Sequence, residues 1–597
     1  MGKKARLRKQ KKNEACQAKQ TQSGYTLPKI SLLLWLTYGA IILSLVYLAF
    51  IILKPGMPSG HDIIAHSIRS KIFIEAFSQG QFPVRWIDWI VNNFSGPFFN
   101  FYQVGFYYVV LLINQVVPSI YTSIKTVVLL SWWLGALFMF LYSKRFGILP
   151  GAFAALIFAF TPYIISDYFV RAAYPESLAI AFSIGILWAL DRLLVTSKVI
   201  YSLPLVLTFA GLLTTHLPTA VIMGPVLVGY FFLLLSLRQA RLKGFLFTLI
   251  SSVLGIGLAG FYLFPALLEL NMVKSSLLTS SYYDFHPHFV YPQQLFSTFW
   301  DYGISKAGPD DGMSFQVGII QWGILLFSLG LLCYKLFKKN GLLVPHIIFW
   351  LVAFLYSLFF IHDISISFWE NIKSIAFIQY PFRYLMVITF ATPILAAIFV
   401  SQFKKIWHQN LIVLIFLVTI LIFYLGYLHP ATYLEDNYFK LNTSGWTKSQ
   451  AAQQAWLEDG YLPVTADEQP AGQLDKWILE QGQAKVEEKT LYNHYKYFVI
   501  QAQNPSVFNL TTHYFPGWKA YIDGVETQID YSDSYGFMKV SVPLGVHKVE
   551  FKFTDTLIRS ISNKVTVLSF TVLVIWQLSA LKLVKKALRD LTRSESL

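Results

Sequence analysis

The sequence predicts a mostly α-helical protein that crosses a membrane many times and carries a β-rich domain on the outer face. Three observations predict this class. Of the 597 residues, 55% are hydrophobic and 13% are charged, whereas a soluble domain carries about 25% charged residues. Apolar residues gather in segments of about 20, the length that spans a bilayer as a helix. One long segment near the C-terminus instead alternates polar and apolar residues, as β-strands do.

The first apolar stretch, 30–53, follows a basic tail at 1–29. It is too long for the apolar core of a signal peptide, so we expect a retained first span. Together with the later apolar stretches this gives twelve predicted spans, at about 30–53, 122–143, 149–166, 175–194, 200–216, 218–237, 245–265, 315–335, 343–361, 382–401, 410–428 and 564–583.

A further apolar segment, 102–117, decides the orientation of the chain. If it does not span, basic clusters such as Lys144-Arg145 and Lys404-Lys405 lie on the same side as the basic tail. Lys and Arg concentrate on cytoplasmic loops. The pattern therefore predicts a multi-pass cell-membrane protein with both termini cytoplasmic and 102–117 as a re-entrant or juxtamembrane piece. The net charge of +16 then reports topology, not a nucleic-acid partner.

Three outer segments are long: 54–121, 266–314 and 429–563. The first two belong to the predicted bundle, 30–428. The third holds 16 acidic and 11 basic residues, a net of −5 that leaves +21 on the remainder of the chain. From about 484 it alternates with period two, and Asp523-Gly524 indicates a hairpin turn. We expect a small extracytoplasmic β-sandwich here, followed at 564–597 by a final span and a basic cytoplasmic tail.

The start of the first outer loop predicts an amphipathic helix at the membrane surface. Asp62, His66 and Arg69 are spaced i, i+4 and i+7 and share one helix face. A carboxylate beside a histidine and an arginine can act as a general base or bind a cation. The alternative is a solvated helix face with an ordinary i,i+4 pair.

A second group of charges, Asp167, Arg171 and Glu176, lies where the chain leaves and re-enters the membrane. Arg171 suits bidentate binding of a phosphate, or it forms an i,i+4 pair with Asp167. Pro175 suits a first helical turn, where Glu176 is favoured by the helix dipole.

Two further candidates occupy the outer ends of spans. His216 is either a ligand-binding side chain or a satisfied interface residue. Arg383 is a second phosphate-binding candidate, and the alternative is an arginine that extends to the interface among Tyr380, Phe382 and Tyr384. The sequence contains no GxSxG, HExxH or CxxC motif and no phosphate-binding lysine loop, which argues against an ATP-driven pump.

These motifs resemble a known superfamily. The retained first span, His61-Asp62 with His66, and the stretches QFPVRW at 81–86 and GPFFNFY at 96–102 are similar to the GT-C integral-membrane glycosyltransferases. The closer resemblance is to bacterial membrane proteins described as 6-pyruvoyl-tetrahydropterin-synthase-related. It continues through Pro162-Tyr163, Asp167, Arg171, Glu176, His216-Leu217, Phe264-Pro265-Ala266 and Pro381-Phe382-Arg383. The name does not imply pterin chemistry, because that synthase is a soluble zinc enzyme and no three-histidine zinc set is evident here.

The resemblance implies an enzyme that moves a sugar from a polyprenyl-phosphate donor in the membrane to an extracytoplasmic acceptor: a surface polysaccharide, a lipid or a protein. Asp62 matches the acid that acts as base or orients the acceptor, His66 would hold it or bind the leaving phosphate, and Glu176 or Asp167 would be the second acid. The resemblance assigns the phosphate and the substrate to Arg171, Arg383, Asp167, His216 and Arg85. Direct displacement would invert the anomeric centre.

The resemblance identifies no certain cofactor, and it includes both metal-dependent and metal-independent enzymes. His61-Asp62 replaces a pair of adjacent acids, which weakens the case for a divalent-cation site in this loop alone. Two alternatives stay open: a transporter or flippase for a lipid-linked polar substrate, and a non-catalytic envelope assembly protein with the β-domain as a binding module.

Overall fold

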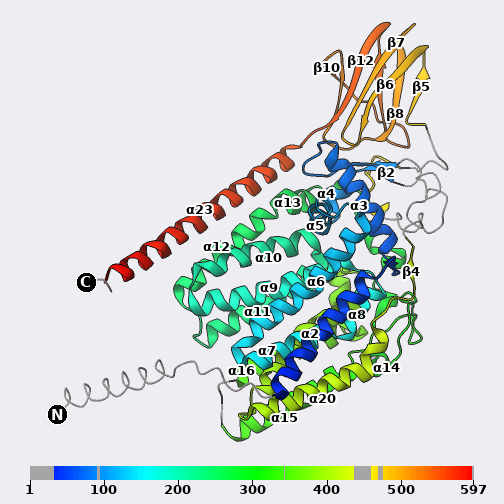
Figure 1. Ribbon diagram of the computed structural model, residues 1–597. Coiled ribbons are helices and arrows are strands. Elements are labelled where there is room, and N and C mark those ends of the chain that lie inside the picture. The colour runs from blue at the N-terminus through cyan, green and yellow to red at the C-terminus, as the bar shows by residue number, and fades with distance from the viewer. Residues whose placement is uncertain are drawn as a thin grey trace.

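The computed structural model describes residues 32–90, 94–339, 341, 343–435, 459–467 and 475–594, which are mostly helical. A bundle of helices carries a β region at one end, and a long last helix leads away from that region (Figure 1). The predicted basic tail at 1–29 lies outside the described residues.

Eight helices of the described chain are long and apolar enough to cross a membrane, and ten spans result if each of two bent helix pairs counts as one. The bent pairs are α7 (Ile148–Ala159) with α8 (Pro162–Phe169) and α12 (Leu242–Leu258) with α13 (Gly260–Leu268). Ten of the twelve predicted spans are thus matched by this measure when each bent pair counts as one. The other two predicted spans coincide with α2 (Leu32–Leu53), a helix of 22 residues, and with the apolar stretch Val199–Thr215 of 17 residues. Both lengths lie within the range of roughly 17–25 residues that can cross a bilayer as a helix.

The ambiguous segment 102–117 contains α5 (Gly105–Asn114), a helix of ten residues. At about 1.5 Å per residue it is near 15 Å long and cannot cross a hydrocarbon core of about 30 Å. The segment is consequently not a span, as its effect on the charge pattern predicts.

Two buried helices form the centre of the bundle. The first, α9 (Tyr174–Thr196), packs against α6 (Ile120–Ser143), α10 (Ser202–Thr215), α11 (Leu217–Ser236) and α12. The second, α19 (Leu385–Val400), packs against α7, α15 (Ile319–Phe337) and α16 (Val344–Ile361). Glu176 lies in the first turn of α9, and Arg383 lies in the 3₁₀ turn Pro381–Tyr384 that leads into α19. Two deeply buried helices therefore position these two side chains.

The β region consists of two antiparallel sheets, with strand orders β10-β9-β12-β7-β6 and β11-β8-β5. Apolar residues of β7, β8, β11 and β12 share one core, so the two sheets pack face to face. Asp523 and Gly524 have positive φ and join β9 to β10, which confirms the predicted hairpin. The strands are β5 (Trp477–Gln481), β6 (Ala484–Tyr492), β7 (Tyr495–Ala502), β8 (Ser506–His513), β9 (Trp518–Ile522), β10 (Val525–Thr527), β11 (Phe537–Val542) and β12 (Gly545–Phe553).

The first outer loop connects the bundle to the β region. It contains β1 (Met57–Pro58), α3 (Ile63–Ser78), β2 (Ile87–Ile90), β3 (Phe94–Gly96), α4 (Phe98–Phe101) and α5. Trp86 and Phe101 enter the β-region core. Beside them, the buried Lys496 of β7 pairs with Asp88. At the other end of the loop, β1 pairs with β4 (Tyr433–Leu434), which follows α20 (Ile406–Tyr424).

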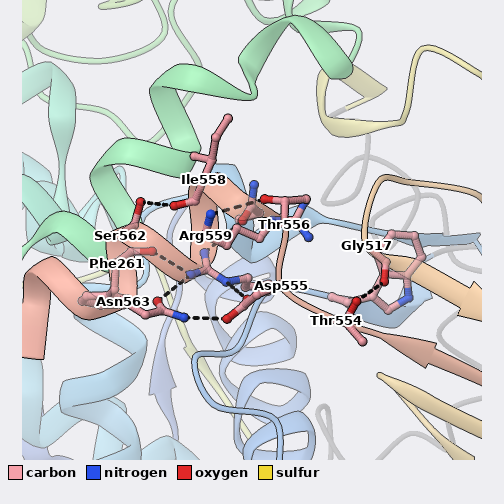
Figure 2. A network of polar contacts seen from close by, with 12 residues as sticks. Phe261, Gly517, Thr554, Asp555, Thr556, Ile558, Arg559, Ser562 and Asn563 are labelled. Atoms are coloured by element: carbon pink, nitrogen blue, oxygen red, sulfur yellow. Dashed lines mark hydrogen bonds and ion pairs between the residues drawn. The ribbon is translucent and has the colours of Figure 1, made fainter.

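The last helix, α23 (Leu557–Ser594), begins directly after β12 and descends along the bundle (Figure 1). It starts seven residues before the predicted span, because its first two turns carry polar residues that hydropathy does not recognise as membrane helix. One of them, Arg559, is completely buried and pairs with Glu269 at 2.9 Å. This ion pair fixes the end of the β region to the bundle, and Figure 2 shows Arg559 among the polar residues at the start of α23.

Candidate functional site

Four of the predicted site residues form one buried ionic cluster: Asp167, Arg171, Glu176 and Arg383. Arg171 pairs with Asp167 and, through Nη2, with Glu176 Oε2 at 2.9 Å. Arg383 Nε lies 3.2 Å from the same Glu176 oxygen. The i,i+4 pair of Arg171 with Asp167 considered from the sequence is present, and Glu176 extends it to a second arginine.

The cluster depends on the break between α8 and α9. Pro162 occupies the first turn of α8, and Pro175 occupies the first turn of α9. Between the two helices Ala172 adopts a positive φ of 52°. This tight turn carries Arg171 back over Asp167 and places Glu176 at the N-terminus of α9, where the helix dipole favours a carboxylate.

Tyr163 completes the cluster and was not among the predicted site residues. Its hydroxyl accepts a hydrogen bond from Arg171 Nη1 at 3.0 Å and donates one to Glu176. The pattern that could have found it is its spacing: Tyr163 and Asp167 lie on one face of α8, and Arg171 follows after another four residues, in the turn beyond the helix.

Asp62 reaches this cluster through backbone contacts. His61 N donates to Val170 O and Asp62 N donates to Arg171 O, both at 3.0 Å. Gly60 allows this approach, since an added Cβ would lie 2.7 Å from Ala172 Cβ. Asp62 is therefore fixed beside the turn that carries Arg171.

The carboxylate of Asp62 is exposed. Asp62 occupies the N-cap position of α3, yet its side chain does not cap the helix. Among the described residues no hydrogen bond or ion pair of this carboxylate is found. Asp62 therefore differs from Asp167 and Glu176, whose carboxylates are already bonded to arginine.

The two predicted histidines lie around the same turn. His66 is buried one turn after Asp62, and its Nδ1 is hydrogen-bonded to the Tyr107 hydroxyl at 2.9 Å. Burial lowers the pKa of His66 well below its usual value, and the charges of Arg69 and His216 act in the same direction. His66 is consequently neutral near pH 7.

His216 caps α11, where its Nδ1 accepts a hydrogen bond from Thr219 N at 3.3 Å. His216 thus has its hydrogen bond made within the protein, which is the second of the two roles considered from the sequence. His216 also lies within electrostatic range of Glu176, Arg171 and Arg383. It therefore belongs to the surroundings of the cluster.

Arg85 lies elsewhere. Its guanidinium donates to Asn100 Oδ1 at 3.0 Å, to Phe261 O at 2.9 Å and to Asn563 Oδ1 at 3.0 Å, and its Nε lies 3.7 Å from Asp555. Figure 2 labels three of these partners, Phe261, Asp555 and Asn563, at the start of α23. Burial lowers the pKa of Arg85 to about 10, so the side chain stays charged at neutral pH. In this setting Arg85 joins the first outer loop to the last helix and does not contact the ionic cluster.

The arrangement is electrostatically balanced. Both arginines are already compensated by Asp167 and Glu176, so a phosphate that binds here has to share or displace those bonds. Among the described residues no group of three or more His, Cys, Asp or Glu side chains is placed to hold a metal ion. A cavity of about 700 Å³ lies in the β region beside Asp467, Asp530, Tyr531 and Asp533, and no predicted site residue lines it.

The fold and the cluster define a multi-pass helical membrane protein with charged residues gathered at the helix ends on the side of its β region. The chain belongs to the family described as 6-pyruvoyl-tetrahydropterin synthase related domain, membrane protein, whose model matches residues 99–430. That range includes the four residues of the ionic cluster and His216, and it excludes Asp62, His66 and Arg85.

Three solved structures are similar to this chain. ArnT from Cupriavidus metallidurans bound to undecaprenyl phosphate is 15% identical, with a TM-score of 0.38 over 65% of this chain and 64% of ArnT. The apo oligosaccharyltransferase of Archaeoglobus fulgidus is 9% identical, with a TM-score of 0.43 over 72% and 59%. AglB of the same organism, in complex with an inhibitory peptide and a dolichol-phosphate, is 9% identical, with a TM-score of 0.44 over 70% and 59%. The chain thus covers less than two thirds of each of these proteins. No curated protein matches the chain.

Proposed function

We propose that this protein is a membrane glycosyltransferase that moves a sugar from a polyprenyl-phosphate donor to an acceptor outside the cytoplasm. The observation that carries the proposal is the docking of residues 60–62 on the turn at 170–172. The docked segment carries an exposed, unbonded carboxylate next to the turn that holds Arg171, whose guanidinium shares Glu176 with Arg383. A base and a cationic group side by side are what displacement of a phosphate leaving group requires.

In the proposed reaction Asp62 accepts the proton of an acceptor hydroxyl. The acceptor oxygen then bonds to the anomeric carbon as the bond from that carbon to the phosphate oxygen breaks. The electron pair leaves with the polyprenyl phosphate, and Arg383 and Arg171 compensate its charge. The configuration of the anomeric carbon inverts, because the displacement is direct. No other co-reactant is needed.

The contacts of the remaining residues support more specific proposals for their roles. Glu176 is completely buried and bonded to both arginines, so we assign it the positioning of the two guanidinium groups and not the transfer of a proton. Asp167 holds Arg171 from the other side. His66, neutral and bonded to Tyr107, positions the first turn of α3 beneath Asp62.

The test is sugar transfer in proteoliposomes that contain the full-length protein and undecaprenyl phosphate linked to glucose, mannose or N-acetylglucosamine, with a cell-envelope extract added as the source of acceptor hydroxyls. We expect release of undecaprenyl phosphate from one of these donors, and we expect D62N to lose it. The matched control is D310N, which neutralises another exposed acid of the outer loops. Transfer by D62N at the wild-type rate would contradict the role of Asp62, and wild-type protein that binds none of the donors would contradict the function.

A further inference from the structure

A strip of four aromatic side chains lies next to the ionic cluster: Tyr282, His288, Tyr380 and Phe382. The ring centroids of Tyr282 and His288 are 5.1 Å apart, those of His288 and Tyr380 are 4.9 Å apart, and those of Tyr380 and Phe382 are 5.2 Å apart. Two distant parts of the sequence, the loop 266–314 and the entrance to α19, contribute two residues each. We refer to these four residues as the aromatic strip.

The aromatic strip leads from the surface to the arginines. At its outer end Tyr282 is 44% exposed, and at its inner end Phe382 is buried. The Arg171 guanidinium lies 5.1 Å from the centre of the Phe382 ring, and that of Arg383 lies 4.8 Å from the centre of the Tyr380 ring. These distances are typical of cation–π contacts. The strip therefore begins where the proposed leaving phosphate is bound and ends at an exposed ring.

The polar atoms of Tyr282 and His288, at the outer end of the strip, form hydrogen bonds within the protein. His288 Nε2 donates to Tyr282 O at 2.9 Å, and His288 Nδ1 accepts from Ser305 Oγ at 2.9 Å. The Tyr282 hydroxyl donates to Ser305 O at 3.3 Å. Gln379 Nε2 ties the two parts of the strip together through Leu278 O at 2.8 Å. Tyr282 consequently offers a ligand the face of a fixed ring and not a free hydroxyl.

Charged groups lie within electrostatic range of this exposed ring. Burial raises the pKa of Tyr282, the carboxylates of Asp311 and Asp62 raise it further, and Arg171 opposes them. Tyr380 is likewise within electrostatic range of Asp62. The loop that carries Asp311 also reaches the start of α3, where His61 Nε2 donates to Tyr302 O at 3.2 Å. Two carboxylates, Asp311 and Asp62, thus lie within electrostatic range of the exposed Tyr282 ring.

We propose that the exposed face of Tyr282 is the platform on which the sugar ring of the lipid-linked donor lies, and this proposal rests on the proposed transferase function. A pyranose presents an apolar face of C–H groups and a rim of hydroxyls. The apolar face stacks on an aromatic ring, and the hydroxyls donate to carboxylates such as Asp311 and Asp62. A donor bound in this way has its sugar on Tyr282 and its phosphate towards Arg383, with Asp62 beside the acceptor.

The test measures binding of two lipids to the full-length protein in nanodiscs: undecaprenyl phosphate, and undecaprenyl phosphate linked to the sugar that the protein transfers or binds best. Wild-type protein should bind the sugar-bearing lipid more tightly. In Y282A that preference should fall by about three- to tenfold, the size of one stacking contact, with the affinity for undecaprenyl phosphate itself unchanged. Y282F should behave like wild type, because the ring is kept. Y492A removes a tyrosine of similar exposure, 45%, from the β region and serves as the matched control.

Each outcome bears on one proposal or the other. The platform is overturned if wild-type protein binds both lipids equally, if Y282A keeps the wild-type preference, or if Y282A weakens both lipids alike. The transferase fails separately if Y282A loses the preference as expected while D62N still transfers sugar at the wild-type rate.

Discussion

At the scale of single residues, the carboxylates of the candidate site divide into two kinds. Asp167 and Glu176 are buried and bonded to arginine, while Asp62 is exposed and unbonded among the described residues. Removing one partner of a buried ion pair is strongly destabilising, because the other charge is left without compensation. Stability and activity should therefore respond differently to substitutions at the two kinds of acid.

We expect E176Q to lower the free energy of unfolding by about 3–5 kcal/mol, since it leaves two buried guanidiniums partly uncompensated. D62N should change stability by no more than about 0.5 kcal/mol, as for an ordinary surface substitution. Thermal unfolding in detergent measures both, and E75Q, at an exposed acid of α3, is the control. Equal stability of E176Q and wild type would contradict the buried cluster.

Asp311 gives a prediction about pH. Burial raises its pKa from 3.8 to about 6, so the folded protein holds this proton more tightly than the unfolded chain. The stability that Asp311 confers on its loop is present below pH 3.8 and is lost as the pH rises through about 6. D311N should remove this dependence and slow hydrogen exchange of residues 301–313 at pH 7. Exchange that stays as pH-dependent in D311N as in D310N would show that another group is responsible.

Residue roles were predictable from the sequence only where the partners are close along the chain. Asp167, Arg171 and Glu176 meet across one turn, and their spacing already indicated contact. Arg383 joins them from the turn that leads into another helix. Arg85 instead donates hydrogen bonds to Asn563 and Phe261, which are distant from it in the sequence. No pattern around Arg85 distinguishes a phosphate-binding arginine from one that fixes a helix.

At the scale of elements, the site depends on how the beginning of α3 meets the turn between α8 and α9. The contact is made by backbone atoms, so its geometry depends on the close approach of Gly60 to Ala172. The spacing of Asp62 and His66 predicted the helix, which the structure contains, with Asp62 at its N-cap. The contact of that N-cap with the turn at 170–172 could not be predicted, because a contact between backbone atoms does not depend on which side chains are present.

G60A should reduce sugar transfer by about 100-fold without unfolding the bundle, because a Cβ at this position displaces Asp62 from Arg171 and misplaced catalytic groups are costly. The control is G426A, where an added Cβ meets no atom within 4 Å. Transfer rates in proteoliposomes compare the two. If both variants matched wild type, the docking of residues 60–62 would not control the reaction.

At the scale of the whole molecule, the β region and the bundle form one packed unit. Trp86 of the first outer loop lies in the β-region core against Trp518 and Phe553, and Arg559 and Glu269 form a buried pair where α23 begins. Alternating residues predicted the strands, and apolar length predicted most of the spans. The junction escaped prediction because QFPVRW resembles a loop motif and contains nothing that indicates insertion into a sheet.

W86A should destabilise the β region by about 3–5 kcal/mol, the usual effect of removing a large buried aromatic side chain. Limited proteolysis and hydrogen exchange across 475–553 would record the loss. W407A, at a tryptophan that is 51% exposed, is the matched control and should have little effect. Protection of the β region unchanged in W86A would mean that the first outer loop is not part of its core.

The most direct measurement is an experimental structure of the full-length protein with a non-cleavable phosphonate analogue of an undecaprenyl-phosphate sugar. The account predicts the phosphonate group next to Arg383 and Arg171 and the sugar ring on Tyr282. It predicts the Asp62 carboxylate near the face of the anomeric carbon that is opposite the phosphonate. A head group bound at the opposite end of the bundle, or in the β-region cavity, would contradict it.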